Sequence, residues 1–143
     1  YRCSYCRAMT AGMRELIGKD PALRVAMKEF PILGPDSLRA SRAALAAHRQ
    51  GRYEAMHWAL MEASDLSEAG IVAIARGLGL DLGRLVADMA SGEIGAVIGA
   101  NLALAQALGI NGTPSFVVGG TLLPGAVPIE RLGALIAAER RGG

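Results

Sequence analysis

The sequence contains only two cysteines, Cys3 and Cys6, and only two histidines, His48 and His57. A structural zinc site usually takes four cysteine or histidine ligands. The histidines lie far along the chain from the cysteines and nine positions apart, which is outside the usual spacing of a zinc finger. The pattern therefore gives little support to zinc held within one chain, and only a site shared between chains stays open.

Aromatic residues and long apolar runs are also scarce. Aromatics make up 4% of the residues, so we expect a core of Ala, Leu, Ile, Val and Met, a composition that favours helices. The most apolar segment, 94–110, is interrupted by glycines and polar residues and falls short of the roughly 20 apolar residues that span a bilayer. A net charge of +2, with basic residues scattered among carboxylates, argues against nucleic-acid binding.

The remaining composition is that of a folded domain. Apolar residues make up 52% and charged residues 20% of the 143 positions, which suits one domain with a sizeable core. The chain starts without methionine and without a signal-peptide pattern, so we expect it to be part of a longer product.

Apolar periodicity and turn residues predict seven helices and three strands. The predicted helices cover residues 7–18, 36–48, 53–63, 67–78, 82–90, 93–108 and 129–140, and the predicted strands cover 23–30, 115–118 and 121–123. Gly119-Gly120 is typical of a two-residue hairpin turn. The block of helices looks inserted into a βαβ–ββα plan.

The spacing of the cysteines favours redox chemistry. Residues three apart at the start of a helix share one face, at a separation that a disulfide tolerates. Cys3 would meet the free N–H groups at the positive end of the helix, which favour its thiolate. We expect Cys6, one turn further in, to be more buried and to resolve a mixed disulfide formed at Cys3. A purely structural disulfide would close a tiny loop and contribute little stability.

Two further places carry candidate residues. Pro114 directly precedes a predicted strand and is either an ordinary strand-start residue or a cis-proline, and the local sequence alone favours the trans form. His57 and Trp58 could border a substrate groove, but their helical spacing favours packing. Lys28 and Glu29, near the end of the predicted strand 23–30, could influence Cys6, but a solvated or paired role at the surface is favoured.

Taken in order, these motifs resemble the DsbA-like thiol:disulfide interchange proteins of the thioredoxin superfamily. Each motif is weak alone, but the ordered set is specific and spans essentially the whole chain. The motifs are CSYC at Cys3–Cys6 heading a helix, KEFPIL at 28–33, a helical segment with Tyr53 and HWALM at 57–61, and LGINGTPSF at 108–116.

The resemblance implies an α/β, thioredoxin-like fold with an inserted helical domain. Residues 1–35 and 109–143 would form the thioredoxin-like domain and residues 36–108 the insertion. It also implies that Pro114 is cis and that Thr113 and Pro114 lie beside the cysteines, where the Thr113 backbone binds a substrate strand. The family has a strand that runs into the cysteine helix, so we expect N-terminal strand(s) to be missing from this chain.

The resemblance further implies a protein disulfide oxidoreductase without metal or cofactor. Cys3 and Cys6 would be catalytic, with Ser4 and Tyr5 tuning the redox potential, and an oxidase is favoured over an isomerase. The expected partners are protein or peptide thiols and disulfides and a redox partner that recycles the cysteines, with membrane contact only through that partner. The expected location is the bacterial periplasm or another extracytoplasmic space. The alternative is a non-catalytic binding or chaperone module whose cysteines form a structural disulfide or hold a metal.

Overall fold

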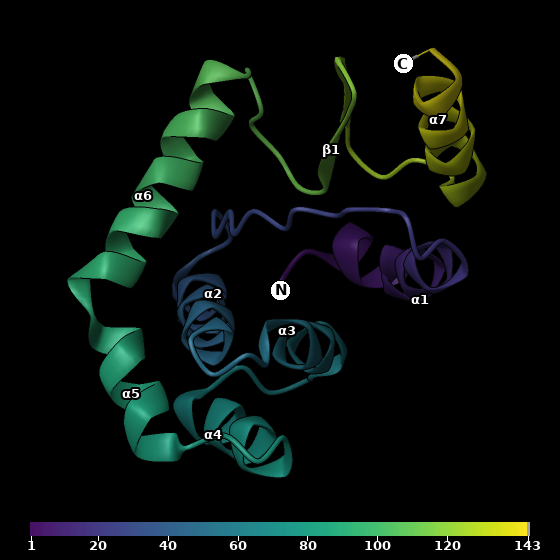
Figure 1. Ribbon diagram of the computed structural model, residues 1–143. Coiled ribbons are helices and arrows are strands. Elements are labelled where there is room, and N and C mark those ends of the chain that lie inside the picture. The colour runs from purple at the N-terminus through teal and green to yellow at the C-terminus, as the bar shows by residue number, and fades with distance from the viewer. Residues whose placement is uncertain (143) are drawn as a thin grey trace.

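The structure, a computed structural model, describes residues 1–142, which form seven helices and one β-hairpin (Figure 1). Each of these elements lies within a few residues of a range predicted from the sequence. In chain order they are α1 (Ser4–Lys19), α2 (Pro35–His48), α3 (Tyr53–Glu62), α4 (Glu68–Gly77), α5 (Leu82–Ala90), α6 (Gly92–Ala107), β1 (Ser115–Val118), β2 (Thr121–Pro124) and α7 (Ile129–Gly142).

Short polar side chains divide the helical block into separate helices. Ser67, Asp81 and Ser91 each accept a hydrogen bond from the backbone N–H three residues further along. These bonds satisfy amides of the first helical turn that have no partner within the helix. Helices α4, α5 and α6 therefore begin at capping residues and change direction there.

The larger hydrophobic core surrounds α2, which packs against α3, α4, α5 and α6 (Figure 1). Ala40, Ala43, Ala44 and Ala47 of α2 are fully buried, and their small side chains let the neighbouring helices approach closely. The surrounding helices and the loop before α4 contribute larger buried side chains, which include Met56, Leu60, Leu66, Ile71 and Leu85.

A smaller core lies between the hairpin, α1 and α7. Its buried members are Met9, Leu123 and Leu132. Helices α1 and α7 approach closely at Gly12, where an added Cβ would lie 2.5 Å from Cγ1 of Ile129. Glycine is therefore the residue that permits this packing. The division into domains 1–35 with 109–143 and 36–108 stays a prediction.

The hairpin pairs β1 and β2 antiparallel, with Ser115 opposite Pro124 and Val118 opposite Thr121. Its turn, predicted at Gly119-Gly120, has Gly119 at φ +56°, in the left-handed region that glycine adopts readily. Among residues 1–142 the sheet consists of these two strands.

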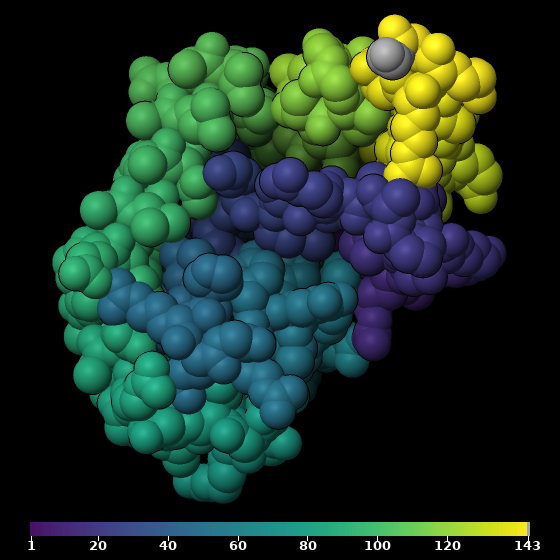
Figure 2. Space-filling model, viewed as in Figure 1, coloured from purple at the N-terminus to yellow at the C-terminus, as the bar shows by residue number. Residues whose placement is uncertain are grey.

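Residues 21–34 link α1 to α2 as an extended segment that crosses between the helical half and the hairpin with α7 (Figures 1 and 2). The prediction of a strand over 23–30 is wrong for the described chain, where these residues form no ladder. A strand requires hydrogen bonds to a neighbouring strand, and an alternating pattern of side chains does not supply that neighbour.

Within the described residues, no single helix is long and apolar enough to cross a bilayer. Helices α5 and α6 together reach that length and composition, but they are bent by 56° at the break between them. Leu85, Ile94 and Ile98 of this pair lie in the core around α2.

Replacing Leu60 with alanine should strongly destabilise the protein, because Leu60 is fully buried between the helices of the larger core. We expect Leu60→Ala to lower the free energy of unfolding by about 2–5 kcal/mol, measured by denaturant titration with circular dichroism. Val86 of α5 is 50% exposed, so the control Val86→Ala should change the free energy of unfolding by about 0.5 kcal/mol or less. Equal decreases in the free energy of unfolding of the two variants would contradict this description of the core.

Candidate active site

Cys3 occupies the N-cap of α1, and its own side chain provides the cap. Its backbone is extended (φ −76°, ψ 113°), and Sγ accepts a hydrogen bond from the Cys6 N–H at 3.1 Å. The sulfur takes the place of the side-chain oxygen that usually pairs with an amide of the first turn. This cap explains why α1 begins at Ser4, three residues before its predicted start. Both cysteines are free thiols.

The pKa values of the two cysteines are displaced in opposite directions. Burial disfavours the Cys3 thiolate, but hydrogen bonds from Cys6 and from the Thr113 side chain outweigh it and lower the pKa of Cys3. Burial is the largest cause that raises the pKa of Cys6, to about 12, followed by its hydrogen bond to Cys3. The pair therefore consists of a Cys3 that favours the thiolate and a Cys6 that retains its proton.

The exposures of the two cysteines reverse the expectation from the sequence. Cys3 is 6% exposed, whereas Cys6 is half-buried. The loop before β1 covers Cys3, whose thiol donates a hydrogen bond to the Thr113 carbonyl oxygen at a distance of 3.3 Å. The expectation that Cys6 is the more buried cysteine is wrong, because position along a helix does not tell which distant loop covers it.

The covering loop is fixed to the base of the hairpin. The peptide bond between Thr113 and Pro114 is cis. The Ser115 hydroxyl donates to the Gly112 carbonyl oxygen at 2.9 Å, and the Gly125 N–H donates to the Pro114 carbonyl oxygen at 2.8 Å. These bonds hold the loop against the hairpin, and the hydrogen bond between Cys3 and Thr113 joins it to the start of α1, so residues more than one hundred positions apart in the sequence meet there.

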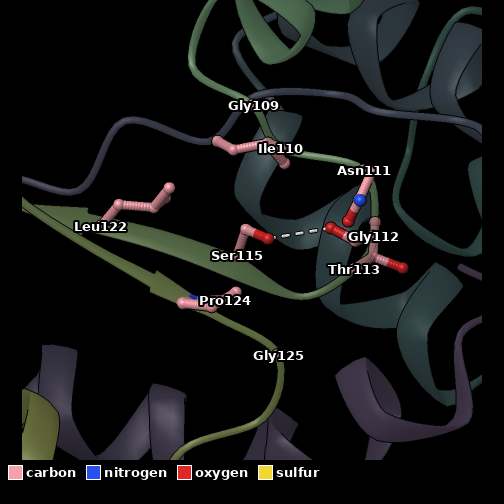
Figure 3. Close-up of a pocket in the computed structure, with 9 residues that line it drawn as sticks. All are labelled: Gly109, Ile110, Asn111, Gly112, Thr113, Ser115, Leu122, Pro124 and Gly125. Carbon is pink, nitrogen blue, oxygen red and sulfur yellow. Dashed lines mark hydrogen bonds between the residues drawn. The ribbon is translucent and has the colours of Figure 1, made fainter.

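A pocket of about 320 Å³ opens beside the same loop (Figure 3). Residues of the loop form one side of it, and residues of the hairpin and the turn after it form the other. The lining residues are Gly109, Ile110, Asn111, Gly112, Thr113, Ser115, Leu122, Pro124 and Gly125. The pocket thus adjoins the loop that covers Cys3.

Ser4 and Tyr5, the residues between the cysteines, lie in the first turn of α1. Both are exposed, and Tyr5 is 68% exposed. Their side chains therefore form part of the molecular surface next to the cysteine pair.

The two arginines that flank the cysteines are held by oxygen acceptors. The Nε of Arg2 donates to Oδ2 of Asp36 at 3.1 Å. Arg7 donates through Nη1 to the Tyr1 carbonyl oxygen at 3.2 Å and through Nη2 to the Ala63 carbonyl oxygen at 2.6 Å. These contacts fasten the chain on both sides of Cys3 to the helical block.

The expectation that Glu29 lies at the surface is wrong. Glu29 is 6% exposed, and its Oε1 accepts hydrogen bonds from the hydroxyls of Tyr1 and Tyr53 at 2.8 and 2.7 Å. The alternation of apolar residues at 23, 25 and 27 does not predict this burial, because Val25 is 41% exposed and the segment forms no strand. Sequence reasoning missed the polar cluster, because its members lie far apart along the chain.

Both histidines contact tyrosine rings. His48 meets Tyr53 edge-to-face with ring centroids 6.1 Å apart, and His57 stacks on Tyr53 at 5.7 Å. In residues 1–142 no group of three or more His, Cys, Asp or Glu side chains is placed to hold a metal ion.

Solved structures of redox proteins superpose on nearly the whole chain. A thioredoxin-like oxidoreductase from Silicibacter pomeroyi DSS-3 is 48% identical, covers 99% of this chain and 82% of its own, and has a TM-score of 0.93. The thiol-disulfide exchange protein alpha-DsbA2 from Wolbachia pipientis is 26% identical and covers 95% of this chain and 75% of its own, with a TM-score of 0.89. These similarities confirm the predicted thioredoxin-like fold.

A Na(+)/H(+) antiporter NhaA from Herminiimonas arsenicoxydans is also similar in sequence. It is 31% identical over 146 residues, which cover 99% of this chain but 23% of the antiporter. The chain therefore spans less than a quarter of the length of this relative.

A family model described as a DSBA-like thioredoxin domain matches residues 1–137. The match includes the cysteine pair at the start of α1, the helical block and the Thr113–Pro114 loop. The recognition made from the sequence motifs is thus confirmed, and the chain belongs to the family of DSBA-like thioredoxin domains.

Proposed function

We propose that the protein is a dithiol–disulfide oxidoreductase that exchanges disulfides with protein substrates through Cys3 and Cys6. The observation that carries this proposal is the capping geometry of Cys3, whose sulfur accepts the Cys6 N–H at 3.1 Å and whose pKa is lowered. A thiolate held at a helix N-terminus is both a good nucleophile and a good leaving group in thiol–disulfide exchange.

In the oxidising direction the active form carries a Cys3–Cys6 disulfide. A substrate thiolate attacks Sγ of Cys3, and Cys6 leaves and takes up a proton. The second substrate thiolate then attacks the substrate sulfur of the mixed disulfide and releases Cys3 as a thiolate. The substrate gains a disulfide, and its two electrons reduce the cysteine pair.

The residues around the pair have supporting roles in this proposal. In this proposal the backbone of Thr113, which lies against Cys3, pairs with an extended substrate segment, and Pro114 shapes the loop that presents it. Ser4 and Tyr5, exposed between the cysteines, tune the potential and contact the substrate.

We further propose that the protein acts as an oxidase on protein thiols in an extracytoplasmic compartment, where disulfides persist. The support is membership of the DSBA-like family together with the lowered pKa of Cys3, because a stabilised thiolate favours the reduced pair and makes the disulfide a stronger oxidant. A separate redox partner must then reoxidise the cysteines after each turnover.

Replacing the cysteines separately tests their roles. We expect Cys3→Ser to reduce catalysed refolding of a reduced, scrambled protein to the uncatalysed rate, because the attacking sulfur is lost. Cys6→Ser should instead accumulate a mixed disulfide between Cys3 and the substrate, seen as a mass adduct that reductant removes. Stable metal retention with no exchange in the native protein would contradict the proposed function.

The rate at which iodoacetamide alkylates the native protein should rise with pH, with a midpoint at a lower pH than in the unfolded protein. The thiolate is the species that reacts, its fraction rises with pH, and the pKa of Cys3 lies below its ordinary value, whereas that of Cys6 is about 12. Protein unfolded in urea is the control, in which both cysteines should titrate near the free value of about 8.5. Identical midpoints in the two states would rule out a stabilised Cys3 thiolate.

Equilibration with glutathione measures the reduction potential of the pair and tests the direction of exchange. We expect a potential less negative than the value of about −270 mV that is typical of thioredoxin. A reduction potential of about −270 mV or more negative would instead indicate a protein that reduces disulfides.

A further inference from the structure

A buried polar cluster lies at the point where the chain enters α1. Its centre is Oε1 of Glu29, which accepts hydrogen bonds from the hydroxyls of Tyr1 and Tyr53. Glu29 is 6% exposed. A carboxyl group buried to this degree is costly unless it is hydrogen-bonded, and the side chains of Ser41, Tyr53 and Tyr1 provide those hydrogen bonds.

His57 completes the contacts of Tyr1. Its Nδ1 lies 2.9 Å from the Tyr1 hydroxyl, and the two rings meet edge-to-face at 5.4 Å. A phenol has one O–H, which Tyr1 donates to Glu29, so Nδ1 of His57 carries a proton and donates to the Tyr1 oxygen. Burial is the main cause that lowers the pKa of His57, to about 4, so the ring is neutral at physiological pH.

The cluster is anchored to the rest of the fold through the backbone of Glu29. The side-chain amide of Asn101 in α6 donates to the Glu29 carbonyl oxygen at 3.1 Å. Tyr53 and His57 belong to α3, and the Tyr1 ring packs on the core around α2. The carboxyl group of Glu29 is therefore held at a fixed position relative to the helical block.

Tyr1 is only two residues before Cys3. Its hydroxyl is bound by Glu29, while its carbonyl oxygen is bound by Arg7, one turn into α1. The position of Tyr1 limits the backbone torsions available to the next two residues. Those torsions place Sγ of Cys3 at 3.1 Å from the Cys6 N–H.

We propose that Glu29 is a positioning residue for the exchange reaction: by binding the Tyr1 hydroxyl, it fixes the segment that leads into Cys3 and thereby preserves the sulfur cap on α1. Glu29 acts through Tyr1 and does not touch the reacting sulfurs. The inference rests on the proposed function, because it assigns a part in the same reaction to a residue that lies outside the cysteine motif.

The two phenols on Glu29 offer a matched pair of variants. Tyr1→Phe and Tyr53→Phe each remove one hydroxyl from the same carboxylate oxygen, but only Tyr1 leads into Cys3. We expect Tyr1→Phe to raise the pKa of Cys3 by about one unit, a tenfold loss of thiolate at pH values below that pKa. Tyr53→Phe should leave the pKa of Cys3 unchanged. The readout is the ultraviolet absorbance of the thiolate during a pH titration, which requires no substrate.

Replacing Glu29 distinguishes a positioning role from an effect of its negative charge on Cys3. Glu29→Gln keeps an oxygen that accepts both phenols and should leave the pKa of Cys3 unchanged, whereas Glu29→Leu removes the acceptor and should raise it as Tyr1→Phe does. A lower pKa of Cys3 in Glu29→Gln would overturn the proposal, because it would show that the carboxylate acts by its charge. If Glu29→Leu does not fold, the comparison of the two tyrosine variants alone decides.

Equal shifts of the pKa of Cys3 in Tyr1→Phe and Tyr53→Phe, or no shift in either variant, would also overturn the proposal. The cluster would then have a purely structural role. Thermal unfolding of both variants checks that their stabilities are matched. Because the titration measures the thiolate and not turnover, it can succeed while exchange activity is absent. That combination would contradict the proposed function and retain the positioning role of Glu29.

Discussion

The hydrogen bond from the Cys6 amide to the Cys3 sulfur is the interaction on which the chemistry of this fold depends. It makes Cys3 the N-cap of α1, and it holds the Cys3 sulfur at the positive end of the helix dipole. A sulfur in this position gains most when it is ionised, because the free amides of the first turn favour negative charge. The pKa of Cys3 is lowered accordingly, whereas burial is the main cause that raises the pKa of Cys6.

The rest of the molecule holds this helix start from three directions. The Thr113–Pro114 loop covers Cys3 from the hairpin side and provides a carbonyl acceptor for its thiol. Arg7 ties α1 to the end of α3 through the Ala63 carbonyl oxygen. The buried Glu29 cluster holds the chain before Cys3. Each contact joins segments distant in sequence, so the reactive geometry depends on how the two cores are packed together.

Much of this could be predicted from the sequence, and the errors share one physical cause. The helices and the Gly119-Gly120 turn depend on neighbours within a few positions, and they were predicted closely. The strand over 23–30 was wrong because a strand depends on a distant partner. The burial of Glu29 and the relative exposure of the two cysteines were wrong for the same reason, since distant side chains and loops decide both.

By itself the sequence determined the set of helices, the hairpin and a cysteine pair spaced to share the first turn of a helix, because each depends on local backbone preferences and on the period of apolar residues. Only the tertiary structure decided that Thr113 rests on Cys3 and that Glu29 binds the tyrosine leading into the active site. These contacts join residues that are 28 and 110 positions apart. Such contacts form only when the packing of both cores offsets the entropy that is lost when the intervening chain is closed into a loop.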